Sequence, residues 1–323
     1  MSRGSTHRQR GAALLTAMII VTLVATLAAA MVWQQWRAVQ VEAAERARTQ
    51  SAWILSGALD FAKLILREDW RSKRSVTALT EPWATPLAES RLSTFLAVDK
   101  ANADDGPEAF LSGNIDDAQA RFNLNNLVTG GVADSKEIDK LARLCEAVGV
   151  ETGIAARLAN GLVAAAGNTA GAPLMPDSVA QLTWLGLDDR SIQALKPYVV
   201  LLRSPGGTPV VVPVNVNTAS KEVLGAVFHL DPATAEHLVQ LRQRTPFKTL
   251  QDFTTQLPPP AQTPAPVAVA NVSVNSSYFM VRGRLRLADR VLVEHSLLWR
   301  NPSTGQSSVL QRERVASLEQ VGG

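Results

Sequence analysis

The chain has little cysteine and, once its first residues are set aside, no net charge. A single cysteine, Cys145, excludes a disulfide within the chain, and we expect it to be a small buried hydrophobe on a helix. Three arginines in residues 1–11, where there is no acid, account for the formal charge of +3. The remaining residues carry 29 basic and 29 acidic side chains. The pI of 9.2 therefore gives little support to nucleic-acid binding.

Sequence motifs of the common catalytic classes are also missing. The chain has no G-x-S-x-G, H-E-x-x-H or C-x-x-C motif and no glycine-rich phosphate loop ending in Lys-Ser or Lys-Thr. His229 and His237 flank an expected turn without an evident third ligand, and His295 stands alone, so we expect packing or capping roles for them. The sequence favours a protein that is not an enzyme and has no cofactor.

Charge is missing altogether from Ala12 to Trp33. A helix of this length, about 33 Å, spans a bilayer core of about 30 Å. The preceding Arg3, Arg8 and Arg10 predict a cytoplasmic N-terminus and a translocated remainder. Three interpretations fit this pattern: a cleaved signal peptide, a plain signal anchor, and a leader that is cut after Gly11.

An amphipathic segment continues from the apolar run. Between Trp33 and Trp70 there is no proline and one glycine, and from Val32 onward apolar residues recur at intervals of three and four. These residues are Val32, Trp36, Val39, Ala43, Trp53, Ile54, Gly57, Ala58, Phe61, Leu64 and Ile65. The sequence therefore predicts one helix from Ala12 to about Leu66, which an ordinary signal peptide does not require.

The next segment, as far as Leu127, has a mixed pattern. The stretches VTALTEPWATPL and RLSTFLAV predict short extended pieces. In DDAQARFNLNNL, the three asparagines, Asn123, Asn125 and Asn126, predict turns and caps. Asp117 and Arg121 are spaced to pair on a helical turn, although we expect a solvated face there.

Helical patterns then dominate as far as Leu202. In the first helix Ile138, Leu141, Leu144 and Val148 share one face, and the expected N-caps of this region are Ser135 and Asp177. Short helices joined by glycine and proline turns predict a compact helical unit.

Residues 214–257 resemble a helix-hairpin-helix module. Asn217 or Thr218 is expected to cap its first helix, and LDPAT to form the turn before the second. DNA-binding versions of the module use hairpin glycines that let the backbone approach a phosphate. Here the hairpin reads His229, Leu230 and Asp231, and the carboxylate would repel phosphate. The sequence therefore has the pattern of the helix-hairpin-helix fold but lacks the hairpin glycines that bind DNA.

The C-terminal part changes to a period of two. After a proline-rich connection at residues 258–270, YFMVRGRLRL, VLVEHSLLW and SSVLQRER predict a three-stranded antiparallel meander with one buried face. The apolar residues expected on that face are Phe279, Val281, Leu285, Leu287, Val291, Val293, Leu297 and Trp299. Arg282, Arg284 and Arg286 are expected on the solvated face.

The order of these segments resembles the K-type minor pseudopilins of the bacterial type II secretion system. The resemblance rests on the leader junction at Gly11, the EPWA, RFNLNNL and VNVNTAS stretches, the helical insertion and the C-terminal meander. It implies an α+β, type IV pilin-like fold, with a long N-terminal helix, an antiparallel sheet and an inserted α-helical domain containing SAM-like and helix-hairpin-helix-like subdomains.

The resemblance also implies a domain order. We expect a leader, a transmembrane and a periplasmic part of the helix, the first part of the head, two inserted helical subdomains and the C-terminal strands, at residues 1–11, 12–33, 34–68, 69–127, 128–212, 213–260 and 261–323. It implies a single-pass inner-membrane protein with a periplasmic C-terminal domain.

The resemblance assigns the N-terminal residues and the partners. A prepilin peptidase is expected to cut between Gly11 and Ala12, and Ala12 to be methylated. Thr16 stands where most pilins have glutamate. This implies a place at the pseudopilus tip, with assembly initiated together with I-, J- and H-type minor pseudopilins, and support for the export of folded proteins.

Two further expectations come from related families. The family's helical domain can bind calcium, and the acidic pairs are Asp104, Asp105, Asp116, Asp117, Asp188 and Asp189, although we expect solvated turns there. The alternative function is a membrane-anchored DNA receptor of the competence type, which would retain the hairpin glycines and a basic face. This chain has neither, so no nucleic-acid partner is expected.

Overall fold

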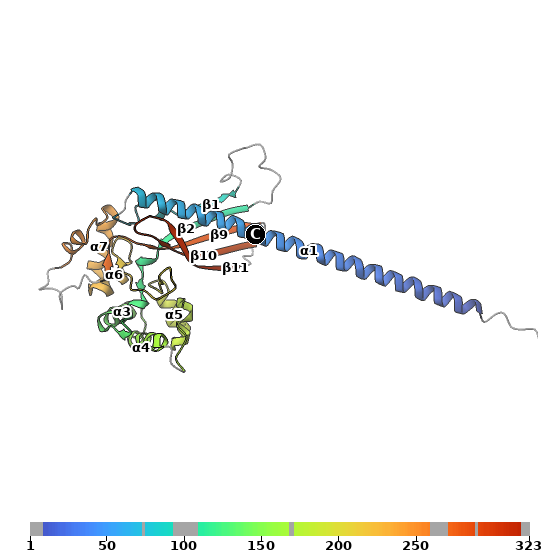
Figure 1. Cartoon of the computed structure of the whole chain (residues 1–323), viewed down its shortest axis with the longest axis horizontal. Helices are drawn as coiled ribbons and strands as arrows, with labels where there is room; N and C mark the ends of the chain where they lie inside the picture. Colours follow the sequence, from blue (N-terminus) through green and yellow to red (C-terminus); the bar gives the residue numbers. More distant parts are fainter. Residues whose placement is uncertain are drawn as a thin grey trace, which may run out of the picture. The chain divides into compact units, whose positions relative to one another are not determined.

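The computed structural model describes residues 9–72, 75–92, 109–167, 171–258, 271–287 and 290–317. The chain divides into two compact units, Met1–Ile54 and Leu55–Gly323. Helix α1, Gln9–Ser72, supplies the described part of the first unit and the first element of the second (Figure 1). The single long helix expected from the sequence is confirmed, and it extends beyond Ala12 and Leu66 at both ends.

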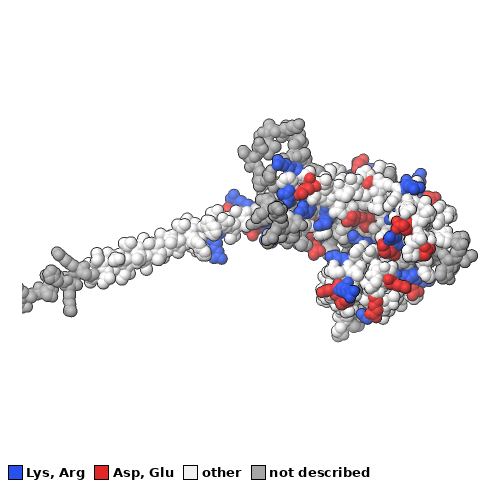
Figure 2. Space-filling model, turned by 180° about the vertical axis from the view of Figure 1, so that it is seen from behind, with Lys and Arg blue, Asp and Glu red and all other residues white. Residues whose placement is uncertain are grey.

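The first unit is helical throughout its described residues. Its N-terminal half carries no acidic or basic side chain between Ala12 and Trp33, as the white part of the helix in Figure 2 shows. Large apolar side chains such as Leu15 and Ile19 are more than half exposed. By length and composition, α1 is the one helix in the described residues that could cross a membrane.

In the second unit, α1 packs on a sheet through residues spaced by four, three and four. Leu55, Leu59, Ala62 and Leu66 are buried, and the last three belong to one core cluster with sheet residues such as Phe279. The apolar stripe expected from the sequence is displaced from this face, because none of its members is buried. Ile54, Ala58 and Ile65 are half-buried, whereas Trp53, Phe61 and Leu64 are exposed.

The sheet has five strands in the order β1-β2-β9-β10-β11, all antiparallel to their neighbours. The strands are β1 (Leu87–Arg91), β2 (Ala109–Asp117), β9 (Tyr278–Leu287), β10 (Arg290–Arg300) and β11 (Ser307–Ser317). The last three confirm the expected meander, and β1 and β2 extend it on one side (Figure 1).

The expectation of one buried face is wrong. Cross-strand pairs place Val281 beside Ser296, whereas Val293 lies beside Arg284. The apolar residues chosen on β9 and β10 therefore lie on opposite faces of the sheet. Both faces are buried: Phe279 and Leu298 pack under α1, and Leu297 packs in a separate cluster with residues of the insertion, Val200, Leu202 and Val212.

The insertion occupies the connection between two adjacent strands. Strand β2 ends at Asp117 and β9 begins at Tyr278, and Asp117 pairs with Phe279 across the sheet. Two short parallel pairs close the insertion. Strand β3 (Phe122–Asn123) pairs with β6 (Val199–Val200), and β7 (Val214–Asn215) pairs with β8 (Val272–Ser273).

Helices make up most of the insertion, together with a small hairpin of β4 (Val128–Thr129) and β5 (Val132–Ala133). They are α3 (Ser135–Ala147), α4 (Gly153–Gly167), the 3-10 helix η5 (Val179–Leu185), α5 (Asp189–Leu195), α6 (Lys221–Phe228), α7 (Pro232–Arg244) and α8 (Leu250–Thr254). One hydrophobic core joins them, from Phe122 to Val272. Arg143 on α3 donates to the Ala226 carbonyl on α6 at 2.8 Å, so the two expected subdomains pack as one body.

The expected N-caps were displaced by one to three residues. Asp134, not Ser135, caps α3 by accepting from the Lys136 and Glu137 N–H groups, and Ser178, not Asp177, precedes η5. Helix α6 is capped by Ser220 and not by Asn217 or Thr218. These side chains are used elsewhere: Asn217 bonds both backbone groups of Phe247, and Thr218 donates to Asp117.

The mixed segment before β2 is only partly extended. VTALTEPWATPL forms turns and a short 3-10 helix, η1 (Pro82–Ala84), before β1 begins at Leu87. Most of RLSTFLAV and nearly all of the proline-rich connection, residues 93–108 and 259–270, lie outside the described residues. Asn123 caps η4 (Leu124–Leu127) as expected.

Candidate functional site

The N-terminal junction lies in the first turns of α1. Gly11 and Ala12 are helical, and residues 1–8 lie outside the described part of the chain. The Thr16 hydroxyl donates to the carbonyl of Ala12 at 2.8 Å and is also 3.1 Å from the carbonyl of Ala13. Thr16 therefore satisfies its own polar group within the helix. It has no charge to offer to a neighbouring subunit.

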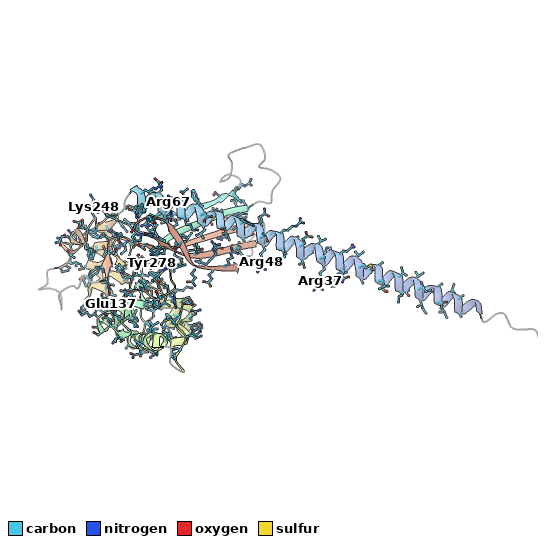
Figure 3. The ribbon with its side chains drawn as sticks, in the orientation of Figure 1. Arg37, Arg48, Arg67, Glu137, Lys248 and Tyr278 are labelled. Atoms are coloured by element: carbon cyan, nitrogen blue, oxygen red, sulfur yellow. The ribbon has the colours of Figure 1, made fainter. Side chains whose placement is uncertain are left out.

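Aromatic residues mark the end of the uncharged segment. Trp33 ends it and Trp36 follows, and the guanidinium of Arg37 lies 5.9 Å from the centre of the Trp33 ring (Arg37 is labelled in Figure 3). Tryptophan is enriched at membrane–water interfaces, and a neighbouring arginine extends into the headgroup region. Residues of these types at Trp33–Arg37 are consistent with the expected membrane anchor.

The helix-hairpin-helix turn keeps the glycine conformation without the glycines. His229 adopts a left-handed backbone with φ of 55°. The Asp231 carboxylate caps α7, since it accepts from the N–H groups of Ala233 and Thr234 at 3.0 Å. Its hydrogen bonds, that from the Thr234 hydroxyl foremost, lower its pKa. An anion at this helix terminus would meet a carboxylate that already occupies the N–H groups.

The acidic pairs do not assemble a calcium site within the described residues. No group of three His, Cys, Asp or Glu side chains there is close enough to hold a metal ion. Asp188 and Asp189 lie at the start of the short helix α5, and Asp116 is exposed. Asp104 and Asp105 lie outside the described residues.

Asp117 departs from the expectation of a solvated face. It is buried and does not pair with Arg121, whose Nε donates to the Pro197 carbonyl. Its carboxylate accepts hydrogen bonds from the Gln119 N–H, Asn215, Thr218 and Ser276. These donors occupy the oxygens that a cation would need, so Asp117 does not fit calcium.

Cys145 and His295 are the two nucleophilic or basic candidates whose environments differ most from solvent. Cys145 is buried on α3, as expected, and burial raises the pKa of its thiol to about 11. His295 lies half-buried on β10, where burial and Arg282 lower its pKa.

Sequence analysis did not identify two buried charged residues on β10, Arg300 and Glu294, as functional candidates. Arg300 ion-pairs with Asp69 near the end of α1, and Glu294 with Arg312 and Arg314 on β11. A strand pattern assigns such charges to solvent. No signal within the strand indicates that α1 covers this face.

Comparisons with known proteins agree with this architecture. Two family models match the chain, both described as type II secretion system protein K, one over residues 120–204 and the other over residues 214–275. These ranges correspond to the parts of the insertion closed by β3–β6 and β7–β8.

Whole-chain relatives belong to the same family. Type II secretion system protein K of Pseudomonas aeruginosa is 30% identical and aligns over 94% of this chain and 92% of its own length. The protein of the same name from Klebsiella pneumoniae is 29% identical over 89% of this chain and 93% of its own length.

A solved structure shares the fold. It is the GspK-GspI-GspJ complex from the type 2 secretion system of enterotoxigenic Escherichia coli, in which one chain matches with a TM-score of 0.61 and 21% identity over 85% of this chain and 99% of that chain. That match supports the α+β, pilin-like architecture with an inserted helical body. The whole-chain relatives carry the family assignment: this chain belongs to the type II secretion system protein K family, whose members are minor pseudopilins of the protein secretion apparatus.

Proposed function

We propose that this chain occupies the tip of a type II secretion pseudopilus in one copy. There it initiates assembly with other minor pseudopilins and supports the export of folded proteins from the periplasm. The observation that carries this proposal is Thr16, whose hydroxyl bonds to its own helix backbone. In most pilins the glutamate at this position neutralises the N-terminal amine of the subunit above. An unpaired ion in so apolar a setting costs several kcal/mol.

A chain with Thr16 has no acid to offer to a subunit above it, and at the tip none is needed. Its own N-terminal amine can still receive a glutamate from the next subunit. The size of the insertion, which packs as one helical body, supports the same place, since such bulk is hard to repeat along a narrow filament. This role is structural, and no enzymatic activity is proposed.

The partners proposed are the I-, J- and H-type minor pseudopilins. Support for the first two comes from the related complex, which contains GspK, GspI and GspJ by its description. The H-type partner rests on the family resemblance alone.

Processing at the N-terminus is the second part of the proposal. A prepilin peptidase cuts between Gly11 and Ala12, the new amine of Ala12 is methylated, and α1 remains as a single-pass inner-membrane anchor with the head in the periplasm. Intact mass of membrane-extracted protein tests this. A mature start at or beyond Ala30 would indicate an ordinary signal peptidase and remove the basis for the tip assignment.

Crosslinking tests the position. The variant Asp60→Cys is expressed in cells that contain the whole secretion system. The Asp60 side chain on α1 is 67% exposed. The native Cys145 is buried and serves as the unreactive control. Crosslinks to unlike minor pseudopilins are expected. Ladders of this chain crosslinked to itself along isolated filaments would contradict a single copy at the tip.

The DNA-receptor alternative has no favourable observation. Asp231 fills the helix terminus that would face a phosphate. Submicromolar binding of the full chain to duplex DNA at physiological salt would favour that alternative instead.

A further inference from the structure

A continuous set of buried polar side chains connects the end of α1 to the helical insertion. We call it the buried polar chain. Its members are each at most 7% exposed, and they come from α1, the segment after it, β2, the insertion, the segment before β9, and β10. They are Asp69, Thr77, Asp117, Asn215, Thr218, Ser276 and Arg300.

Arg300 holds the α1 end of this chain. Its Nη1 donates to the Leu66 carbonyl at 3.1 Å and to Asp69 Oδ2 at 3.0 Å. Its guanidinium also lies 4.6 Å from the centre of the Phe279 ring. The guanidinium is rigid and planar, so contacts in several directions define the position of the helix end relative to β10.

Thr77 and Ser276 form the middle. Arg300 Nη2 donates to Thr77 Oγ1 at 3.2 Å and to the Ser276 carbonyl at 2.9 Å, and the Ser276 N–H donates to Thr77 Oγ1 at 3.1 Å. Thr77 follows α1 and Ser276 precedes β9. Arg300 therefore bonds to both the segment after α1 and the segment before β9.

Asp117 holds the end at the insertion. The hydroxyls of Ser276 and Thr218 each donate to Asp117 Oδ2 at 2.6 Å, and Asn215 Nδ2 lies 3.0 Å from the same oxygen. Asn215 Nδ2 also lies 3.0 Å from the Thr77 carbonyl. Asn215 and Thr218 lie at the start of the second half of the insertion, in β7 and just before α6.

These bonds are directional and connect the insertion to the head. Apolar contacts of the kind made by Leu202 and Val212 tolerate sliding, because they are not directional. A shift of β7 away from Asp117 would remove two of the donors of this buried carboxylate, Asn215 and Thr218, which is unfavourable. The polar contacts therefore select an orientation that the apolar contacts alone would not.

We propose that Arg300 and Asp117 are positioning residues that fix the helical insertion in one orientation on the end of the spine helix. The surfaces of α1 and of the insertion then meet neighbouring pseudopilins in a fixed register. The fixed register with neighbouring pseudopilins rests on the proposed function, whereas the fixed orientation of the insertion does not.

The experiment measures the orientation and the assembly separately, with the full chain in detergent micelles. Spin labels are placed at Glu68 on α1 and Arg157 on α4, both exposed, while the buried Cys145 remains unlabelled. Thr218→Val and Asp117→Asn each disturb hydrogen bonds at the insertion end. Thr254→Val is the matched control, because the bond of the Thr254 hydroxyl within the described residues is to the Gln251 carbonyl of its own helix.

The expected result is a single narrow distance distribution for the wild type and Thr254→Val, and a broad one for Thr218→Val and Asp117→Asn. Recovery of co-expressed I- and J-type minor pseudopilins with the chain should fall in the same two variants. Thr218→Ser keeps the hydroxyl and should restore both readouts, which a general loss of folding would not predict.

Two results would overturn the inference. One is a distribution in Thr218→Val and Asp117→Asn as narrow as in the control. The other is a broad distribution with undiminished recovery of partners. If the wild type itself recovers no partner, the proposed function is contradicted, and the distance distributions still decide whether the buried polar chain fixes the orientation.

Discussion

Gly305→Ala is expected to loosen the attachment of α1 to the turn between β10 and β11. Gly305 has φ of +71°, and an added Cβ would come 2.6 Å from Trp70 Cδ2. The Trp70 Nε1 donates to the Pro302 carbonyl at 3.1 Å, so the ring cannot move without losing this bond. A left-handed backbone costs alanine about 1–2 kcal/mol, and overpacking costs about 1–3 kcal/mol. The total expected loss of unfolding free energy is about 2–5 kcal/mol.

Thermal unfolding of the full chain in detergent, followed by near-ultraviolet circular dichroism, measures the effect. Gly207→Ala is the control, because Gly207 has φ of +83° and nothing lies within 4 Å of its added Cβ. Gly207→Ala should lower the free energy of unfolding only by the cost of a left-handed backbone at alanine. In a Trp70→Ala background the excess cost of Gly305→Ala should disappear. Equal destabilisation by the two glycine substitutions would refute the steric part of the reasoning.

Three further predictions concern Cys145, Asp117 and His229. Because the pKa of the Cys145 thiol is about 11, iodoacetamide at neutral pH should modify it only after urea unfolding, as mass spectrometry would show. Burial raises the pKa of Asp117 above its ordinary value of 3.8, so the folded state binds the proton more tightly. The wild type should therefore gain stability relative to Asp117→Asn as the pH falls towards 3.8, and urea titrations at several pH values test this sign. His229→Gly relieves a left-handed φ of 55° and should stabilise the chain by up to about 1 kcal/mol, whereas His229→Val should destabilise it, both measured by thermal unfolding.

The elements with a strong period were predictable from the sequence. The long helix and the three C-terminal strands were, because an uninterrupted spacing of three and four, and then of two, leaves few alternatives. The helical insertion followed for the same reason. Cap residues were harder, since Asp134 and Ser135 are both good N-caps and adjacent, and only the backbone geometry distinguishes them.

The burial of β10 was not predictable from its own pattern. Glu294, Ser296 and Arg300 alternate with apolar residues and so indicate a solvated face, yet α1 covers that face and the insertion covers part of the other. Which distant segment lies on a face is a tertiary property. The same limitation applies to Asp117, whose donors come from Asn215, Thr218 and Ser276, far away in the sequence.

For the candidate residues at the N-terminus, the structure adds less to what the sequence indicates. Gly11, Ala12 and Thr16 were chosen from the sequence, and the structure adds the hydrogen bonds of Thr16. Cleavage and methylation remain predictions, because they depend on the peptidase.

The attachment of the insertion has a consequence for how such heads can diverge. Asp117 and Phe279 are cross-strand partners, so the insertion begins and ends where a tight hairpin turn would otherwise join β2 to β9. A segment attached at two neighbouring points can lengthen, shorten or be exchanged without altering the order or register of the strands. Evolution can therefore remodel what the head presents at its far end while the sheet and spine stay the same. By the same reasoning, a foreign domain could be inserted between β2 and β9 without changing the strand order of the sheet.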